Sequence, residues 1–326
     1  MKFLFIAKRN NKPSTRYRVL PLATRLREMG HDIEICSSEF SFGSRINILN
    51  LARTSDVVVI QRKLFGAFYF RLLRSCSSKL IFDLDDAIFL RSDGTPSQRR
   101  MDGFERTLRA CDAIWTGNHY LMDNIGRYSN KGFLIPTPVN PAVYDNAVVK
   151  HSIPTLVWIG SRSTRKYLES HRNIFECLGR TVSELQLKVI SDFEIQFENL
   201  RVINVPWSQK AEADEIAKCH IGIAPMDDNA WTRGKCALKI LQYMACSLPV
   251  VTSAVGANKE AVVHGETGLH ATDKNEWVKS IIQLINDVEK RTRFGLAGRQ
   301  QVEQRYSEEV IVNQMIESLS SLNLSL

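Results

Sequence analysis

The feature that most constrains the fold is a regular alternation of short apolar runs with amphipathic stretches, beginning near residue 2. The apolar runs lie at 2–7, 32–36, 57–60, 80–84, 113–116 and 132–135. Helical periodicity fills the intervals between them, as in 16–29, where Gly30 is expected to end the helix. Because strands covered by helices on both faces are apolar throughout, this alternation predicts a parallel, doubly wound α/β sheet.

Three prolines within six residues, Pro136, Pro138 and Pro141, interrupt the alternation and predict a linker. A second series of apolar runs follows at 155–159, 187–190, 202–205, 221–224 and 249–252, with helices predicted at 166–178 and 238–245. We therefore predict a Rossmann-like domain over 1–140 and another over 141–305, with their strand carboxyl ends facing each other across a cleft. A C-terminal helix over 306–326 is expected to pack back on the first domain.

The charge of the chain is unevenly divided. Residues 1–150 contain 23 Lys and Arg and 14 Asp and Glu, a net charge of +9, whereas residues 151–326 have a net charge of −1. Hydrophobic residues at 44% and charged residues at 24% exclude a disordered or collagen-like chain. The excess positive charge of the first half predicts an anionic partner: nucleic acid, a membrane surface or a phosphorylated substrate.

The cysteines and the apolar runs indicate the cellular compartment of the protein. The seven cysteines form no C-x-x-C pair, which argues against a zinc ribbon or a thioredoxin motif and favours reduced thiols. The apolar run at 3–7 is shorter than the ~7–15 residues of a secretory signal. No run approaches the ~18 apolar residues that span a bilayer. We expect a cytoplasmic protein, with the inner face of the cytoplasmic membrane as an alternative location.

Four segments of the second half carry a resemblance to a known family. They are Ile-Gly-Ile-Ala-Pro-Met at 221–226, Gly-Lys-Cys-Ala-Leu-Lys at 234–239, Gln-Tyr-Met-Ala-Cys-Ser-Leu-Pro-Val-Val at 242–251 and Gly-Glu-Thr-Gly-Leu at 265–269. In order and spacing they resemble glycosyltransferase family 4, whose members have the GT-B fold and transfer sugars from sugar nucleotides with retention. Ile-Pro-Thr-Pro-Val-Asn at 135–140 is similar to the hinge of that family. The resemblance implies an acceptor-binding first domain and a nucleotide-sugar-binding second domain.

Two positions depart from the family pattern. In the family, one Glu on the Ala-Met-Ala helix binds the ribose and another, eight residues earlier, approaches the donor sugar. Gln242 and Gly234 occupy these positions here. Gln242 can still bind a ribose diol because its amide both donates and accepts hydrogen bonds. The sequence resembles a subgroup with Gly-Lys-x-x-x-Lys-x-x-Gln-Tyr-Met-Ala, which indicates a variant site.

Cations near these positions are the predicted ligands of the donor diphosphate. Negative charge grows on the diphosphate as the glycosidic bond breaks, and an enzyme without a metal must supply cations and backbone donors there. Lys239 lies three residues before Gln242 on the same helical face. Arg233 and Lys235 flank Gly234, whose backbone amide can also reach the leaving group. The alternative for each cation is a solvated surface position.

Further donor contacts are predicted by analogy with the family. The loop from Gly160 to Lys166, with Arg162 between them, matches the position of a diphosphate loop, although it also suits a simple helix cap. Trp207 is a candidate wall of the base pocket or a core residue. Arg16 is expected to bind the donor or an acceptor phosphate, and Glu260 to steer the nucleotide or the sugar.

Asp85 and Asp86 follow the run at 80–84 and stand where the family has a His-Asp pair. They are candidates to accept hydrogen bonds from the acceptor or to act as a base. Asp-Leu-Asp at 83–85 also resembles the metal motif of the GT-A fold, and a helix-capping role through Asp83 or Asp86 is a third interpretation. His119 is a candidate acid, or else a packed or exposed residue. We expect no metal and no cofactor.

One segment bears on the choice of partner. Residues 62–74 are apolar, aromatic and basic, so they suit either a helix resting on anionic lipid or a core helix with basic ends. No nucleic-acid-binding module is recognisable.

The resemblance as a whole implies a retaining, hexosyltransferase-like glycosyltransferase of bacterial surface polysaccharide synthesis: lipopolysaccharide, capsule or exopolysaccharide. Its expected substrates are a UDP-, GDP- or dTDP-sugar and a glycan or polyprenyl-diphosphate-linked acceptor. The alternative is a non-catalytic GT-B subunit that binds sugar nucleotides or glycans. A sugar-nucleotide epimerase fits the motifs less well.

Overall fold

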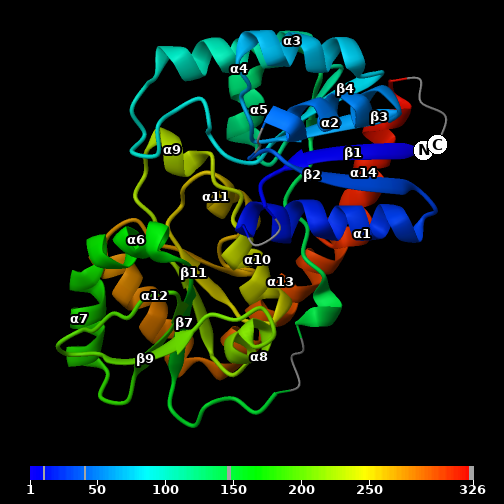
Figure 1. Ribbon diagram of the computed structural model, residues 1–326. Helices are drawn as coiled ribbons and strands as arrows, with labels where there is room; N and C mark the ends of the chain where they lie inside the picture. Colours follow the sequence, from blue (N-terminus) through cyan, green and yellow to red (C-terminus); the bar gives the residue numbers. More distant parts are fainter. Residues whose placement is uncertain (10–11, 40–41, 145–147, 323–326) are drawn as a thin grey trace. The chain divides into compact units, whose positions relative to one another are not determined.

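The computed structural model describes residues 1–9, 12–39, 42–144 and 148–322. The chain forms two compact units, each with one parallel sheet (Figure 1). The first unit comprises Met1–Pro138, Asn229–Cys236 and Glu308–Leu326, and the second comprises Val139–Asp228 and Ala237–Ser307. Residues 323–326, the end of the predicted C-terminal helix, lie outside the described residues.

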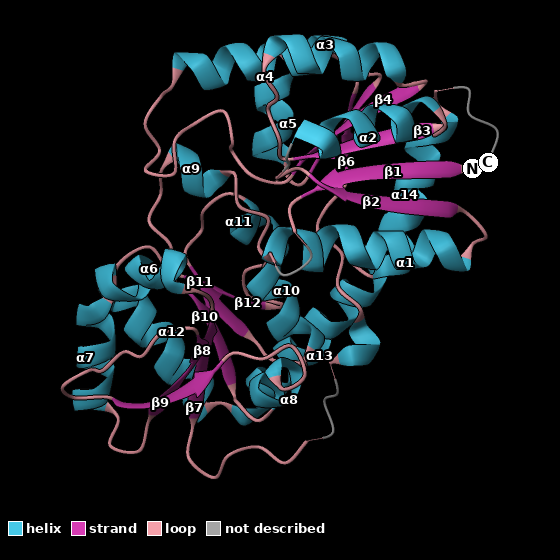
Figure 2. Cartoon of the chain, viewed as in Figure 1, coloured by secondary structure: helices cyan, strands magenta, loops and turns pink. Residues whose placement is uncertain are grey.

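The first unit contains a six-stranded parallel sheet in the order β2-β1-β3-β4-β5-β6 (Figure 2). Its strands are β1 (Lys2–Ala7), β2 (Asp32–Ser37), β3 (Val57–Gln61), β4 (Lys79–Leu84), β5 (Ala113–Thr116) and β6 (Gly132–Leu134). Its helices are η1 (Thr15–Val19), α1 (Leu20–Glu28), α2 (Phe42–Arg53), α3 (Ala67–Cys76), α4 (Gln98–Ala110), α5 (His119–Ile125), α9 (Ala230–Arg233) and α14 (Glu308–Ser320). The predicted parallel, doubly wound architecture is confirmed.

Helices cover both faces of this sheet. One core cluster joins α1 and α14 to β1 and β5, and the indole Nε1 of Trp115 donates to the hydroxyl of Ser318 at 2.8 Å. A second cluster joins the other sheet face to α2, α3 and α4. The predicted return of the C-terminal helix to the first unit is therefore confirmed. Gly30, at φ +87°, follows α1 in the left-handed conformation that commonly ends a helix.

The second unit repeats this plan with strands in the order β12-β11-β10-β7-β8-β9. The strands are β7 (Thr155–Ile159), β8 (Gln186–Ser191), β9 (Arg201–Pro206), β10 (Ile221–Ala224), β11 (Val250–Thr252) and β12 (Gly268–His270). The helices are η2 (Pro141–Val143), η3 (Arg162–Thr164), α6 (Arg165–Ser170), α7 (Arg172–Thr181), α8 (Glu212–Ala217), α10 (Leu238–Ala245), α11 (Ala257–Ala261), α12 (Lys274–Asn286) and α13 (Val288–Arg305). The helix predicted over 166–178 is two helices, which break at His171.

The strand orders show where each unit can bind a ligand. In a doubly wound sheet, ligands bind outside the strand carboxyl ends at the point where the strand order reverses. That point lies between β1 and β3 in the first unit and between β7 and β10 in the second. Lys8 and Arg62 follow the first pair of strands, and Gly160 and Pro225 follow the second.

The segment from Asn229 to Cys236 lies within the range predicted for the second domain, yet it packs in the first unit. The side chains of Ala230, Trp231 and Cys236 lie against the core cluster that contains Phe89. The first unit covers the apolar surface of these side chains. This burial explains why the segment packs in the first unit.

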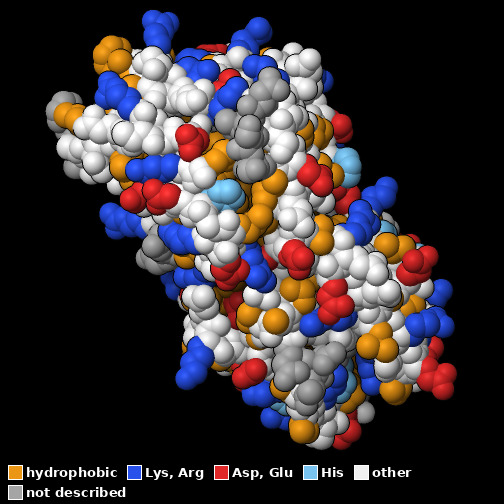
Figure 3. Space-filling view, turned by 90° about the vertical axis from the view of Figure 1, so that its right-hand side faces the viewer, with side chains coloured by type: hydrophobic (Ala, Val, Ile, Leu, Met, Phe, Trp, Pro, Cys, Tyr) orange, Lys and Arg blue, Asp and Glu red, His pale blue; other side chains and the backbone are white. Residues whose placement is uncertain are grey.

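The surface carries charges of both signs. On the face drawn in Figure 3, Lys and Arg side chains are interspersed with Asp and Glu, and hydrophobic side chains form small separate patches. Within the described ranges, no helix combines the length and the hydropathy that crossing a membrane requires.

Candidate functional site

The first unit contains a buried ion pair next to the predicted catalytic residues. Arg18 of η1 donates to both carboxylate oxygens of Asp83 at the end of β4, through Nε at 2.9 and 2.8 Å and Nη2 at 2.6 Å. Nη2 also donates to the carbonyl oxygen of Ile135 at 2.9 Å. Burial by itself would lower the pKa of the Arg18 guanidinium, but the Asp83 carboxylate raises it above its usual range. The pair is therefore ionic, and it joins η1 to the carboxyl end of β4.

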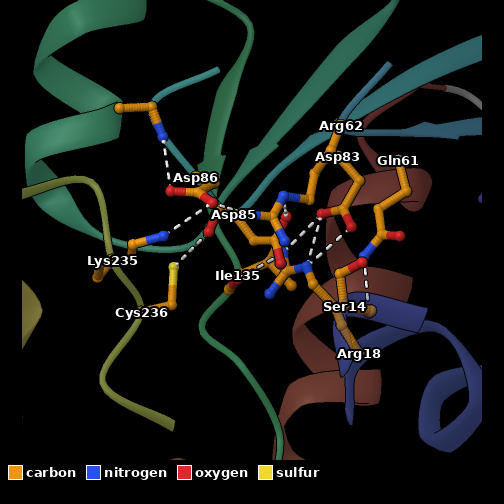
Figure 4. A network of polar contacts seen from close by, with 11 residues as sticks. Ser14, Arg18, Gln61, Arg62, Asp83, Asp85, Asp86, Ile135, Lys235 and Cys236 are labelled. Carbon is orange, nitrogen blue, oxygen red and sulfur yellow. Dashed lines mark hydrogen bonds and ion pairs between the residues drawn. The ribbon is translucent and has the colours of Figure 1, made fainter. Parts of the chain in front are cut away.

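Asp85 and Asp86 are held by cations from two other elements (Figure 4). Arg62 Nε lies 3.0 Å from an Asp85 carboxylate oxygen, and Arg62 Nη2 contacts Asp86. Lys235 Nζ lies 3.1 Å from the same Asp86 oxygen. Arg62 adopts the left-handed conformation at φ 51°, which is uncommon for a residue with a side chain. Such backbone strain is found mostly at functional sites.

The arrangement bears on the alternative roles of these carboxylates. Asp83 is occupied by Arg18, while Asp85 and Asp86 share Arg62, so the Asp-Leu-Asp pattern does not present a common ligand set. Asp86 also accepts the backbone N–H of Ala87 at 3.2 Å, which is a local turn and not a helix cap. Among the described residues, no group of three or more His, Cys, Asp and Glu could hold a metal ion. Metal independence stays a prediction.

A third cation lies near this network. Lys8, which directly follows β1, has its pKa lowered by burial and next by the charge of Arg62. Lys8 and Arg62 therefore approach each other at the reversal point between β1 and β3. Sequence reasoning assigned no role in this site to Lys8 or Arg62. Arg62 could have been found, because it comes just after the predicted strand at 57–60, in the same parallel sheet as the strand that precedes Asp85.

The other predicted residues of the first unit lie in η1, in α5 and at the end of α9. The Arg16 guanidinium lies 5.8 Å from the ring centre of Tyr17, its neighbour in η1. His119 is exposed at the start of α5. The backbone N–H of Gly234 donates to the carbonyl of Trp231 at 3.2 Å, and that of Lys235 to Thr232 at 3.0 Å. These two amides therefore close the last turn of α9 in this structure.

In the second unit, a buried cluster joins Gln242 to Trp207. Gln242 is 2% exposed, and its Nε2 donates to the Tyr144 hydroxyl at 2.9 Å and to Glu212 at 3.1 Å. Trp207 Nε1 donates to the other Glu212 oxygen at 2.7 Å. Tyr144 also donates to Glu212, at 3.2 Å. The sequence predicted Gln242 and Trp207 but missed Glu212, the carboxylate that connects them.

Trp158 joins two further predicted residues at the carboxyl end of β7. The Lys239 ammonium lies 4.3 Å from its ring centre, within cation–π range. Gly160 lies against the same indole, because a Cβ there would come within 2.3 Å of the ring. Trp158 is fully buried, and its indole N–H has no hydrogen-bond partner among the described residues. The Lys239 ammonium and the loop after Gly160 are thus neighbours.

The segment from 160 to 166 contains a helix cap and three basic side chains, Arg162, Arg165 and Lys166. Ser161 and Thr164 form a reciprocal capping box around η3, as the alternative interpretation of this loop requires. The backbone N–H of Arg162 donates to Asp192 at 2.6 Å. Lys166 Nζ lies 5.3 Å from the ring centre of Tyr167.

Glu260 lies apart from that loop. It is on α11. Burial raises the pKa of Tyr306, and the charge of Glu260 raises that pKa further.

The predicted site residues therefore fall into two groups. The first unit contains Arg16, Asp85, Asp86, His119, Arg233, Gly234 and Lys235. The second contains Gly160, Arg162, Lys166, Trp207, Lys239, Gln242 and Glu260. Within the first unit, direct contacts connect Lys235 to Asp86. Within the second, they connect Lys239 to Gly160 through Trp158, and Gln242 to Trp207 through Glu212.

Two doubly wound units, each with a parallel six-stranded sheet and joined by a C-terminal helix that returns to the first, define the GT-B fold. Residues 153–287, less than half of the chain, match the family of the glycosyl transferases group 1. The chain thus has the GT-B fold, and residues 153–287 of its second unit are similar to the glycosyl transferases group 1. The predicted resemblance to glycosyltransferases is confirmed at this level; family 4 and the variant subgroup remain predictions.

Individual relatives agree with this classification. The N-acetyl-alpha-D-glucosaminyl L-malate synthase of Bacillus anthracis is 33% identical over 79 residues, 24% of this chain and 21% of that protein. The match thus spans about a fifth of the relative's length. A glycosyltransferase of Rickettsia africae has a TM-score of 0.76 at 13% identity, with 99% of each chain covered. Anabaena HepE in complex with UDP has a TM-score of 0.74 at 16% identity, with 98% of this chain and all of that chain covered. At these identities the two structures show the shared fold.

Proposed function

We propose that the protein transfers a sugar, with retention, from a nucleotide-diphosphate-sugar to a glycan or lipid-linked acceptor. The match of residues 153–287 to the glycosyl transferases group 1 carries this proposal. Anabaena HepE, which shares the fold, has been crystallised with UDP, which supports a UDP-, GDP- or dTDP-sugar as the donor class.

The donor side of the proposal rests on the second unit. The Lys239 ammonium and the loop after Gly160 both lie at Trp158, and the hydroxyls of Ser161 and Ser163 are 2.9 Å apart in that loop. A cation beside hydroxyls at a strand carboxyl end suits a diphosphate. We assign Lys239, Arg162 and Lys166 to this diphosphate. The Gln242–Glu212–Trp207 cluster is assigned to the nucleoside and Glu260 to the sugar side.

The acceptor side rests on the first unit, with Asp85 and Asp86 as the polar groups and Arg62, Lys8 and Lys235 as their cationic surroundings. In the proposed transfer, the acceptor oxygen forms a bond to the anomeric carbon of the donor sugar. It does so on the same face of the sugar from which the diphosphate leaves. The acceptor proton moves to the departing phosphate oxygen, whose bond to the sugar breaks. Asp85 accepts a hydrogen bond from a neighbouring hydroxyl of the acceptor and so orients it, and the cations balance the growing charge.

We also propose a setting for the reaction: bacterial surface polysaccharide synthesis, in the cytoplasm at the inner face of the membrane. Neither α2 nor α3 contains an acidic residue. Phe68 on α3 is 79% exposed, and Leu72 on the next turn and Ile46 on α2 are exposed as well. Exposed apolar side chains on helices whose own charged residues are all basic suit an anionic lipid surface.

A second candidate is a non-catalytic subunit that binds sugar nucleotides. The observation that favours it is the state of Gln242, whose amide donors are both used inside the buried cluster. Gly234 likewise supplies no carboxylate.

A thermal-shift screen with UDP-, GDP- and dTDP-sugars, followed by an assay of nucleotide release, tests both functions. A ligand that binds the folded state stabilises it by RT ln(1 + [L]/Kd). Stabilisation with nucleotide release supports the transferase. Stabilisation without release from any donor supports the binding subunit, and no stabilisation by any donor contradicts both.

A further inference from the structure

The 229–236 segment packs in the first unit although the residues before and after it belong to the second. Its only helix, α9, has four residues and begins at Ala230. The side chain of the N-cap residue Asn229 accepts the backbone N–H groups of Trp231 and Thr232 at 3.0 Å each. A helix of one turn is not stable by itself in water. The contacts of this segment with the first unit must therefore hold it in place.

Asn118 makes the central polar contact with this segment. It lies between β5 and α5, is 1% exposed, and accepts the backbone N–H of Leu121 at 2.8 Å, which caps α5. Its Nδ2 donates to the carbonyl oxygens of Arg233 at 3.1 Å and Lys235 at 2.8 Å. One buried carboxamide thus joins the start of α5 to the residues on both sides of Gly234.

Close backbone approaches fix the register of the segment. A Cβ on Gly234 would lie 2.6 Å from the Cβ of Ala87, and a Cβ on Gly117 would lie 2.3 Å from the Sγ of Cys236. A shift by one residue would force a side chain into the space at Ala87. In the observed register, Lys235 reaches Asp86 and the Cys236 thiol donates to the carbonyl oxygen of Asp85 at 3.2 Å.

We propose that Asn118 is a positioning residue: by binding the carbonyls of Arg233 and Lys235, it places the Lys235 ammonium on Asp86. Asn118 acts through the backbone of the segment, because its Nδ2 donates to the carbonyl oxygens of Arg233 and Lys235. The functional meaning of this placement rests on the proposed function, in which Asp86 and Lys235 are site residues. The alternative is that Asn118 only caps α5.

The substitution Asn118→Asp separates these roles. An aspartate keeps the oxygen that caps α5 but has no N–H groups for the two carbonyls. Asn124→Asp is a matched control on the same helix, because Asn124 Nδ2 donates to the carbonyl of Tyr120 at 2.7 Å within α5. Asn118→Ser is a second, uncharged variant that also keeps a capping oxygen.

The readout is the alkylation of Cys236 by iodoacetamide as a function of pH, followed by mass spectrometry of its peptide. Burial, and then the charge of Asp85, raises the pKa of the Cys236 thiol to about 12. Release of the segment exposes the thiol and returns its pKa towards the ordinary value of about 8.5. A cap-only role would not change this profile. The peptide of Cys76 provides an internal reference.

We expect Asn118→Asp and Asn118→Ser to raise the alkylation rate of Cys236 at least about tenfold, which corresponds to about 1.4 kcal/mol. Asn124→Asp and the wild-type protein should react at the same rate. If both Asn118 variants fold, by circular dichroism, and Cys236 still reacts at the wild-type rate and pH, the proposal is wrong. Failure of the wild-type protein to bind any UDP-, GDP- or dTDP-sugar would instead contradict the proposed function and leave the Cys236 comparison intact.

Discussion

The Arg18 guanidinium donates to both carboxylate oxygens of Asp83, and the two side chains are only 1% and 4% exposed. The pair ties η1, at the start of the first helical layer, to the end of β4, two residues before Asp85. It therefore supports the strand end from which Asp85 and Asp86 extend. Arg18 also binds the carbonyl oxygen of Ile135, the residue after β6.

Replacing Asp83 with Asn should strongly destabilise the first unit. The buried Arg18 guanidinium would lose its counter-charge, and breaking a buried ion pair by removing one partner costs about 3–5 kcal/mol. Urea unfolding at neutral pH measures the loss. Asp102→Asn, at an exposed position where the carboxylate accepts from Gln98, is the control and should change stability little. If Asp83→Asn lowers the free energy of unfolding no more than the control does, the ion pair does not stabilise this part of the fold.

Replacing Glu212 with Gln should loosen the nucleoside cluster. Three donors, from Gln242, Tyr144 and Trp207, converge on the two Glu212 oxygens, and a Gln side chain has only one oxygen to offer. One buried donor then faces an N–H group, so we expect the free energy of unfolding to fall by about 1–3 kcal/mol in urea. We also expect weaker binding, by calorimetry, of whichever sugar nucleotide stabilises the wild type. Glu266→Gln, at an exposed position, is the control. Unchanged affinity for that sugar nucleotide would show that this cluster does not bind the nucleoside.

The apolar runs predicted both sheets because burial on two faces leaves a signal in every strand except β12. The three-residue strand β12 escaped, since Gly268, Leu269 and His270 form no apolar run. The break between α6 and α7 at His171 was not predicted either, because the two helices together preserve one helical periodicity. Local pattern therefore gives the strands but not every boundary.

The candidate site was less predictable because its connections are long-range. Lys235 and Asp86 are 149 residues apart in sequence, and nothing local to 229–236 indicates that this segment packs in the first unit. Glu212 has the sequence context of an ordinary acidic first helical turn, and only the fold brings it to Gln242. Family resemblance located Gln242 and Lys239, whereas their partners Glu212 and Trp158 required the structure.

A pH dependence of stability is expected from His220. Burial, followed by the charges of Arg291 and Lys150, lowers its pKa from 6.5 to about 4, and its ring accepts the backbone N–H of Thr155 at 3.1 Å. Between these pH values the unfolded state binds a proton that the folded state does not, so His220 makes stability fall as pH falls from 6.5 to 4. Urea midpoints across this range measure the slope. His220→Gln keeps an acceptor and should reduce the slope; an unchanged slope would contradict the assignment.

Vesicle binding tests the exposed apolar side chains of α3. Phe68→Ser with Leu72→Ser should reduce sedimentation with vesicles containing phosphatidylglycerol, because both side chains are exposed beside basic residues. Binding of the wild type should also fall as salt rises. Leu296→Ser, at another exposed apolar position, is the control. Equal sedimentation of the α3 variant and this control would argue against a membrane-contacting α3.

Lys239→Ala should weaken donor binding without unfolding the second unit. The ammonium lies over the Trp158 ring next to the loop after Gly160, so its removal takes a positive charge from the proposed diphosphate position. Hydrogen bonds to charged groups contribute about 1.5–3 kcal/mol, which corresponds to about a tenfold to hundredfold loss of affinity for whichever sugar nucleotide stabilises the wild type. Lys279→Ala, at an exposed position on α12, should bind that donor as the wild type does. Equal affinities of the two variants by calorimetry would remove Lys239 from the donor site, and the diphosphate would then have to be assigned to other cations of the loop, Arg162 and Lys166.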